Sequence, residues 1–175
     1  MEKKGKMSVK IEPYDDRLVE RFECEAKRIR SVLGDDVTIE HVGSSAALIG
    51  GKNIVDILVG VEDFSAGLGV GMKLLGIGYH LGNISEDDRI FMASREGETQ
   101  AGDFHVHICA KGLAEYTKML RFRDYLRMNR DVALEYEKMK KVFAKEAGYD
   151  RKKYKELKGE YVGRLVEECF IRQVA

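Results

Sequence analysis

Asp56 is the residue whose type and position most clearly indicate chemistry. It interrupts the apolar run Ile54–Val61, where a carboxylate has no packing role. Buried Asp is rare unless it is paired, hydrogen-bonded or bound to a metal. A Gly-Ser pair, Gly43 and Ser44, precedes it in a loop of small residues that ends at Gly51. We therefore expect a functional site around Asp56.

The loop Gly43–Gly51 has the composition of a phosphate-binding turn. If it opens a helix, its backbone N–H groups and the hydroxyls of Ser44 and Ser45 would face an anion. Lys52 follows directly and is a further candidate phosphate ligand. The alternative is a tight connection whose glycines only relieve steric crowding, and loop chemistry alone leaves both interpretations open.

Two histidines, His105 and His107, occur in the segment Phe104–Cys109. Residues two apart on a strand project from the same face. Imidazole is a common metal ligand and can also hydrogen-bond a phosphate. A half-exposed sheet surface without any ligand has the same pattern, so both interpretations stay open.

Arginines are interleaved with the apolar positions of the segment Leu113–Leu126, and Arg123 is one of them. Such a helix face is ordinarily solvated surface. Arginine is also the natural bidentate clamp for phosphate.

Hydrophobic periodicity predicts the elements that must position these residues. The predicted helices are Asp15–Leu33, Ala66–Leu75, Leu113–Leu126, one capped by Asp131 and ended by Gly148, and one capped by Asp150. The predicted strands are Val37–Val42, Ile54–Val61, Tyr79–Leu81, Arg89–Ser94 and Phe104–Cys109. We expect an α/β (α+β) fold, with a mixed, mainly antiparallel sheet of about five strands, flanking helices and a C-terminal helical cluster.

The length and the charge of the chain limit the classes of protein to which it can belong. The 175 residues fit a single domain, residues 1–175, in which residues 1–10 form a short solvated tail. The 30 Lys and Arg are balanced by 30 Asp and Glu, which gives no support to nonspecific nucleic-acid binding. The sequence leaves the oligomeric state open, and a homo-oligomer is compatible with it.

Apolar runs and cysteines indicate the compartment. No apolar run approaches the roughly 20 residues that cross a bilayer. The start of the chain lacks the apolar segment of a signal peptide, so we expect a cytoplasmic protein with no membrane partner. Three cysteines without a CxxC motif predict free, mostly buried thiols: Cys24, Cys109 and Cys169.

The segments IEHVGSS, KNIVDILVGV, GY, DRIF, FHVHIC and LRFRDYLR, in this order, resemble the GrpB family. The similarity extends from about Ile11 to Val166, and the family belongs to the nucleotidyltransferase (polymerase-beta-like) fold superfamily. The resemblance implies a Gly-Ser turn followed by a strand with Asp-x-Asp or Asp-x-Glu, whose carboxylates bind two divalent metals. Asp56 matches the first carboxylate, whereas Leu58 stands where the second is expected.

The resemblance also implies which residues form the site. Asp56, His105 and His107 would carry catalysis around one divalent metal, Mg²⁺ or Mn²⁺. The implied phosphate ligands are Gly43, Ser44, Ser45, Lys52, Arg89, Arg123 and Lys158. After Ser45 the chain departs from the usual pattern, because Ala46–Gly51 and Lys52-Asn53 replace a proline-containing segment and Lys-Pro. One Asp cannot hold two cations roughly 4 Å apart unaided.

Two functions follow from these residues. The first is binding of a nucleotide or phosphorylated small molecule, with metal-dependent nucleotidyl transfer to a hydroxyl or amine. The alternative, favoured by Leu58, is a noncatalytic nucleotide- or phosphate-binding or regulatory domain. Fusion of GrpB-like domains to dephospho-coenzyme A kinases links this alternative to coenzyme A, although no residue here selects that ligand.

Overall fold

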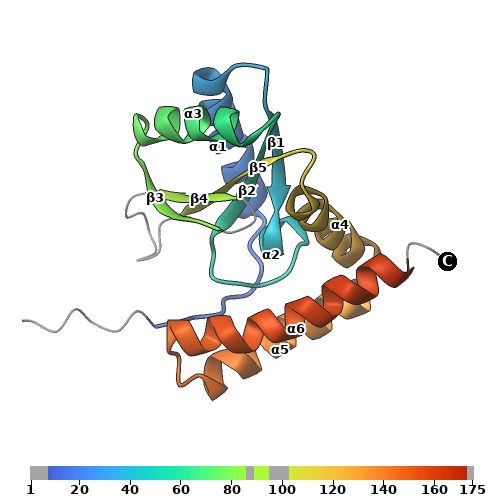
Figure 1. The fold of residues 1–175 in the computed structure, drawn as a ribbon. Helices are drawn as coiled ribbons and strands as arrows, with labels where there is room; N and C mark the ends of the chain where they lie inside the picture. Colours follow the sequence, from blue (N-terminus) through green and yellow to red (C-terminus); the bar gives the residue numbers. More distant parts are fainter. Residues whose placement is uncertain (1–7, 86–88, 95–102, 173–175) are drawn as a thin grey trace, which may run out of the picture.

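A computed structural model describes residues 8–85, 89–94 and 103–172 of the chain. Within these residues the chain forms helices and strands in mixed order (Figure 1). The helices are α1 (Arg17–Leu33), α2 (Gly43–Ala46), α3 (Phe64–Leu75), α4 (Ala114–Met128), α5 (Arg130–Glu146) and α6 (Arg151–Arg172). The strands are β1 (Thr38–Val42), β2 (Val55–Val61), β3 (Tyr79–Ile84), β4 (Ile90–Ser94) and β5 (Phe104–Ala110).

The strands form one five-stranded sheet in the order β1-β2-β5-β4-β3. Strands β2 and β5 run parallel, and the other neighbours are antiparallel. The predicted mixed, mainly antiparallel sheet is therefore confirmed, including the meander of β3, β4 and β5. Strand β2 has a neighbour on each side and is covered on both faces, which explains its nearly continuous apolar sequence.

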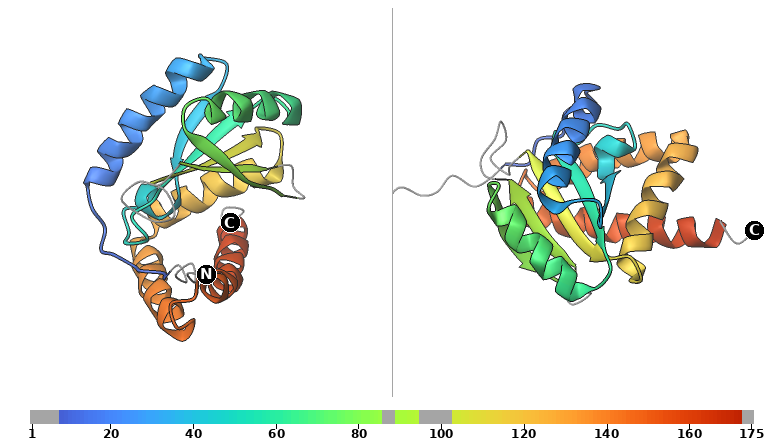
Figure 2. Two further views of the ribbon diagram at one scale, coloured as in Figure 1. Left: turned by 90° about the vertical axis from the view of Figure 1, so that its left-hand side faces the viewer. Right: turned by 90° about the horizontal axis from the view of Figure 1, so that it is seen from above.

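Side chains of β2 point alternately to the two faces of the sheet, so the apolar core and Asp56 lie on opposite faces. Helices α1 and α3 lie side by side on one face of the sheet (Figures 1 and 2). The core on that face includes Val55, Ile57, Val59 and Val61 from β2 with Ile29, Leu33, Val70 and Leu74 from the helices. Because successive strand residues point to opposite faces, Asp56 and Leu58 point away from this core.

On the opposite face of the sheet, α4 packs against β1, β2 and β5, and the antiparallel pair α5 and α6 packs on α4 (Figures 1 and 2). The three helices share an apolar cluster to which Tyr125, Leu126, Ala133, Tyr136, Leu165 and Cys169 belong. The predicted C-terminal helical cluster is thus confirmed. It lies over the face of the sheet that carries Asp56.

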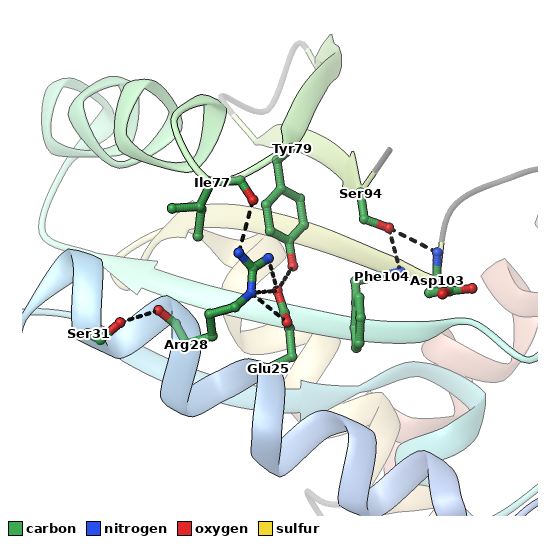
Figure 3. Close-up of polar contacts among 8 residues, drawn as sticks. All are labelled: Glu25, Arg28, Ser31, Ile77, Tyr79, Ser94, Asp103 and Phe104. Carbon is green, nitrogen blue, oxygen red and sulfur yellow. Dashed lines mark hydrogen bonds and ion pairs between the residues drawn. The ribbon is translucent and has the colours of Figure 1, made fainter. Parts of the chain in front are cut away.

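A buried polar network joins α1 to the start of β3 (Figure 3). The Tyr79 hydroxyl donates to Glu25 Oε1 at 2.6 Å, and Arg28 donates to both oxygens of Glu25 and to the carbonyl of Ile77. Burial, together with the bond to Glu25, raises the pKa of Tyr79. Glu25, Arg28 and Tyr79 therefore serve as hydrogen-bond partners for one another, and these bonds hold α1 in register on the sheet.

Hydrogen bonds to Ser94 connect the end of β4 to the start of β5, as Figure 3 shows. Its Oγ accepts hydrogen bonds from the backbone nitrogens of Asp103 and Phe104, at 2.9 and 3.1 Å. This contact helps to fix the start of β5, the strand that carries both histidines.

Two local predictions are wrong. Residues 8–10 are not part of a solvated tail, because Val9 is buried in an apolar cluster with residues of α5 and α6, and Ser8 pairs with Asp150; residues 1–7 lie outside the described part. Helix α5 begins after Asn129, whose non-helical backbone makes it the N-cap, so Asp131 lies in the first turn instead. The three cysteines form no disulfide with one another, and Cys109 and Cys169 are buried, as predicted.

Candidate functional site

A pocket of about 430 Å³ lies between the Asp56 face of the sheet and the α5–α6 pair. Small-molecule sites usually have volumes of about 300–1,000 Å³. The loop after β1, four strands and helices α4 to α6 all contribute to its lining. Among the described residues, its charged lining is one carboxylate, Asp56, and six cationic side chains: Lys52, Arg89, Lys140, Arg151, Lys155 and Lys158.

Asp56, His105 and His107 come together in this pocket. The parallel pairing of β2 with β5 places Asp56 opposite His105. Asp56 Oδ1 lies 3.3 Å from His105 Nδ1 and 3.5 Å from His107 Nε2. Burial by itself raises the pKa of Asp56, but hydrogen bonds and charge from the two histidines outweigh burial and hold this pKa below its ordinary value. The carboxylate is therefore an anion at neutral pH.

The two imidazole rings pack around Phe91, with ring centroids 5.0 and 5.4 Å from its own. Their remaining nitrogens, His105 Nε2 and His107 Nδ1, are buried and have no hydrogen-bond partner among the described residues. Because the nitrogens nearer Asp56 are placed to donate to it, the remaining two carry lone pairs when the rings are neutral. The contacts from the two histidines therefore orient the Asp56 carboxylate.

Gly43 allows the loop to approach this carboxylate. Its φ of +76° lies in the region that favours glycine, and a Cβ at this position would lie only 2.9 Å from Asp56 Cβ. Ser44 follows at the pocket wall. Of the two interpretations that the sequence left open for this loop, a helix start is the one observed, although α2 is only four residues long.

Ser45 has an internal partner. Its hydroxyl lies 2.9 Å from His41 Nε2, and the His41 ring stacks on Phe22 at 4.4 Å between centroids. Burial, aided by the charge of Arg127, lowers the pKa of His41 to about 4, so this imidazole is neutral. Ser45 borders the pocket, but its hydroxyl is used in the His41 contact.

Lys140 is a site residue that the sequence reasoning missed. Its side chain is only 2% exposed. Its Nζ donates to Ser44 Oγ at 2.8 Å and to the carbonyl of Gly50, and it lies 4.7 Å from the Tyr136 ring centroid. Burial and the charge of Lys158 lower the pKa of Lys140 to about 7. The sequence feature that could have identified Lys140 is its position among the inward-facing apolar residues of α5.

Helix α6 supplies the basic wall of the pocket. Arg151, Lys155 and Lys158 recur at spacings of four and three, so they share one face of the helix. Only Lys158 was predicted. Burial lowers its pKa, and burial together with the charge of Lys158 lowers the pKa of Lys52 to about 8. These lysines therefore face one another across a partly dehydrated space.

The two predicted arginines are paired with acids of the protein. Arg89 lines the pocket, where its guanidinium lies 2.7 Å from Glu115. Arg123 lies outside the lining and is held by Glu40 and Asp124, both at 2.7 Å. The structure therefore does not bring Arg123 to the pocket.

The sequence profile of a family described as GrpB protein matches residues 8–168. The chain belongs to the GrpB family. A UPF0157 protein of Halalkalibacterium halodurans is 34% identical over 93% of this chain and 83% of its own length. The crystal structure of the conserved protein GrpB from Enterococcus faecalis has a TM-score of 0.82 and 28% identity, covering 95% of this chain and 100% of that one.

The fold extends beyond the GrpB family. The Cid1 poly(U) polymerase, solved with MgGTP bound, has a TM-score of 0.56 and 16% identity, covering 77% of this chain and 44% of the polymerase. This likeness shows a shared fold, and the GrpB-family chain therefore has a nucleotidyltransferase-like fold.

Leu58 shows why the second carboxylate is missing. It is fully buried with Val42 and Cys109, in a cluster completed by residues of α4 such as Met119. Helix α4 thus covers the position that would hold the second acid. A carboxylate there would be buried in this apolar cluster, which is costly.

A divalent metal fits this pocket poorly. Among the residues that the structure describes, no group of three or more His, Cys, Asp and Glu has an arrangement that could hold a metal ion. The single carboxylate of the lining is surrounded by cations. Hard divalent metals prefer several anionic oxygen ligands, and this donor set does not provide them.

None of the described helices combines the length and apolar character needed to cross a membrane.

Proposed function

We propose that this GrpB-family chain binds a nucleotide or another phosphorylated small molecule in the pocket beside Asp56. The observation that carries the proposal is the charge of the lining, with six cationic side chains and one carboxylate. Glu115 offsets Arg89, but the remaining cations still outnumber Asp56. A concave site lined by one sign of charge concentrates ligands of the opposite sign.

The lowered pKa values of two pocket lysines, Lys52 and Lys158, support an anionic ligand. Burial is the largest cause that lowers the pKa of Lys52 and of Lys158; the charge of Lys158 lowers the pKa of Lys52 further, and the charge of Lys155 lowers that of Lys158. A phosphate between them would accept charge-assisted hydrogen bonds and relieve their repulsion. Their side chains are the ones we assign to phosphate contact.

The fold supports a nucleotide as the first ligand class to test. The Cid1 polymerase that shares the fold has structures with MgGTP and MgATP. In this chain the Gly-Ser turn stands directly beside the pocket, as Gly43 and Ser44 line it.

Isothermal titration calorimetry with nucleoside mono-, di- and triphosphates and with coenzyme A tests the proposal. Lys158→Ala should weaken binding about tenfold or more, since a hydrogen bond to a charged group contributes about 1.5–3 kcal/mol. Lys152→Ala removes the same charge from an exposed position of the same helix, outside the lining, and should bind like the parent. Equal affinity of Lys158→Ala and the parent would show that the ligand binds elsewhere.

Nucleotidyl transfer is the second candidate. The observation that favours it is Asp56 beside the Gly-Ser turn in a nucleotidyltransferase-like fold. Release of pyrophosphate from nucleoside triphosphates with Mg²⁺ or Mn²⁺, in the presence of a hydroxyl or amine acceptor, would support it if Asp56→Asn abolished the release. An inactive parent protein under these conditions rejects this candidate.

A further inference from the structure

Asp56 occupies the position where this fold would hold its metals, yet lysines surround it. Lys52, Lys140 and Lys158 line the same pocket as Asp56. Burial lowers the pKa of each lysine, and the charge of Asp56 opposes this shift in all three. Opposite charges at such range attract, and like charges repel in the same measure. A divalent cation entering beside Asp56 would therefore meet one attractive charge and three repulsive ones.

Lys140 is a fixed part of this arrangement. Its Nζ donates to Ser44 Oγ and to the carbonyl of Gly50, and the Tyr136 ring lies below it. An ammonium has three donors, and these two hydrogen bonds use two of them. Because its side chain is buried, its ammonium group stays in a fixed position beside the loop.

The size of the positive surplus distinguishes a polyphosphate from a single phosphate. With both arginines set aside, the lining still holds four lysines against the one charge of Asp56. A single phosphate ester carries at most about two negative charges. It would leave part of the surplus in place, whereas a di- or triphosphate chain would neutralise more of it and could reach several lysines at once.

We propose, resting on the proposed function, that the pocket takes its ligand as a metal-free di- or triphosphate, with Lys52, Lys140 and Lys158 in place of divalent cations. The ammonium groups supply the positive charge that metals supply in a carboxylate-lined site. Asp56 then acts as a negative boundary of the phosphate site and ligates no metal.

Titration calorimetry with orthophosphate, pyrophosphate and tripolyphosphate tests this proposal without assuming the rest of the ligand. Buffers are freed of metal with a chelating resin, because EDTA is itself a polyanion that would compete for the lysines. Affinity should rise by about tenfold per added phosphate, as each new charge-assisted contact contributes. Saturating tripolyphosphate with Mg²⁺ should weaken its binding, since the metal neutralises the charge that the lysines recognise.

Two outcomes overturn the inference while the proposed function stands. One is binding of tripolyphosphate or of a nucleoside triphosphate that requires Mg²⁺ or Mn²⁺. The other is equal affinity for orthophosphate and tripolyphosphate. If no phosphate compound and no nucleotide binds under any condition, the proposed function itself fails.

The variant Asp56→Asn gives an independent arm of the test. At pH 6.5, where the lysines are mainly protonated, loss of the negative charge should tighten tripolyphosphate binding by roughly threefold or more. A metal-binding Asp56 predicts the opposite, a loss of binding. Thermal unfolding of the variant shows that it is folded, and Lys152→Ala serves as the charge-change control outside the pocket.

Discussion

At the scale of single residues, Gly43 and Asp56 depend on each other. Gly43 has a positive φ, and the place of its missing Cβ is occupied by the Asp56 carboxylate. Gly43→Ala should therefore destabilise the protein by about 2 kcal/mol or more, from backbone strain and from overlap with Asp56. Urea unfolding at pH 7 measures this free energy.

Gly148→Ala is the matched control for this substitution. Gly148 also has a positive φ, +58°, but a Cβ there would meet no atom within 4 Å. It should cost about 1 kcal/mol, from the backbone alone. If the two variants lose equal stability, Gly43 is required for its backbone angle and not for its approach to Asp56.

At the scale of elements, α4 decides the chemistry of β2 by covering Leu58. Placing a second acid two residues after Asp56 with Leu58→Asp should destabilise the protein by about 3–5 kcal/mol, because the carboxylate would be buried in an apolar cluster. Chemical denaturation measures the loss. Calorimetry with Mg²⁺ should show no metal binding to this variant.

Leu81→Asp provides the comparison on an exposed strand position. Leu81 lies in the edge strand β3 and is 52% exposed. Its replacement should change stability by roughly 0.5 kcal/mol. A Leu58→Asp variant as stable as Leu81→Asp would mean that α4 moves away easily and that the covered position is open to a second acid.

At the scale of the whole molecule, the packing of α5 and α6 against α4 and the loop after β1 sets the charge of Lys140. Its pKa of about 7 in the folded protein lies below the ordinary value of 10.5 because of burial and the charges of Lys158 and Lys141, against Glu137 and Asp56. Between these two pH values the unfolded chain binds more protons than the folded one, so stability rises with pH.

The parent protein should therefore gain roughly 1–2 kcal/mol more than Lys140→Met when the pH is raised from 7 to 9. Urea unfolding at both pH values measures the difference. Lys138→Met, a change on the solvated side of the same helix, should show the same pH dependence as the parent. Parallel pH curves for the parent and Lys140→Met would show that Lys140 keeps its ordinary pKa.

The accuracy of the sequence predictions followed the range of the interactions involved. Helices and strands were predicted from local periodicity, and all the predicted strands exist. Asp56 was found because a charge in a β-branched run violates a local pattern. Lys140 violates the same rule on α5 but was overlooked, since its stem allows a lysine to border an apolar face without being buried. Arg123 was misplaced because its acidic partner Glu40 lies far away in the sequence.

The sequence by itself determined the family, the α/β architecture and the candidates Asp56, His105 and His107, because motifs and periodicity are written in local residue order. Only the tertiary structure decided three further points. Parallel pairing of β2 with β5 directed both histidines at Asp56, α4 buried Leu58, and α6 brought its lysines over the same carboxylate. The electrostatics of a pocket depend on which distant elements share it and on how much water they exclude. These two properties are the reason why we propose a phosphate as the ligand of a site that resembles a metal centre.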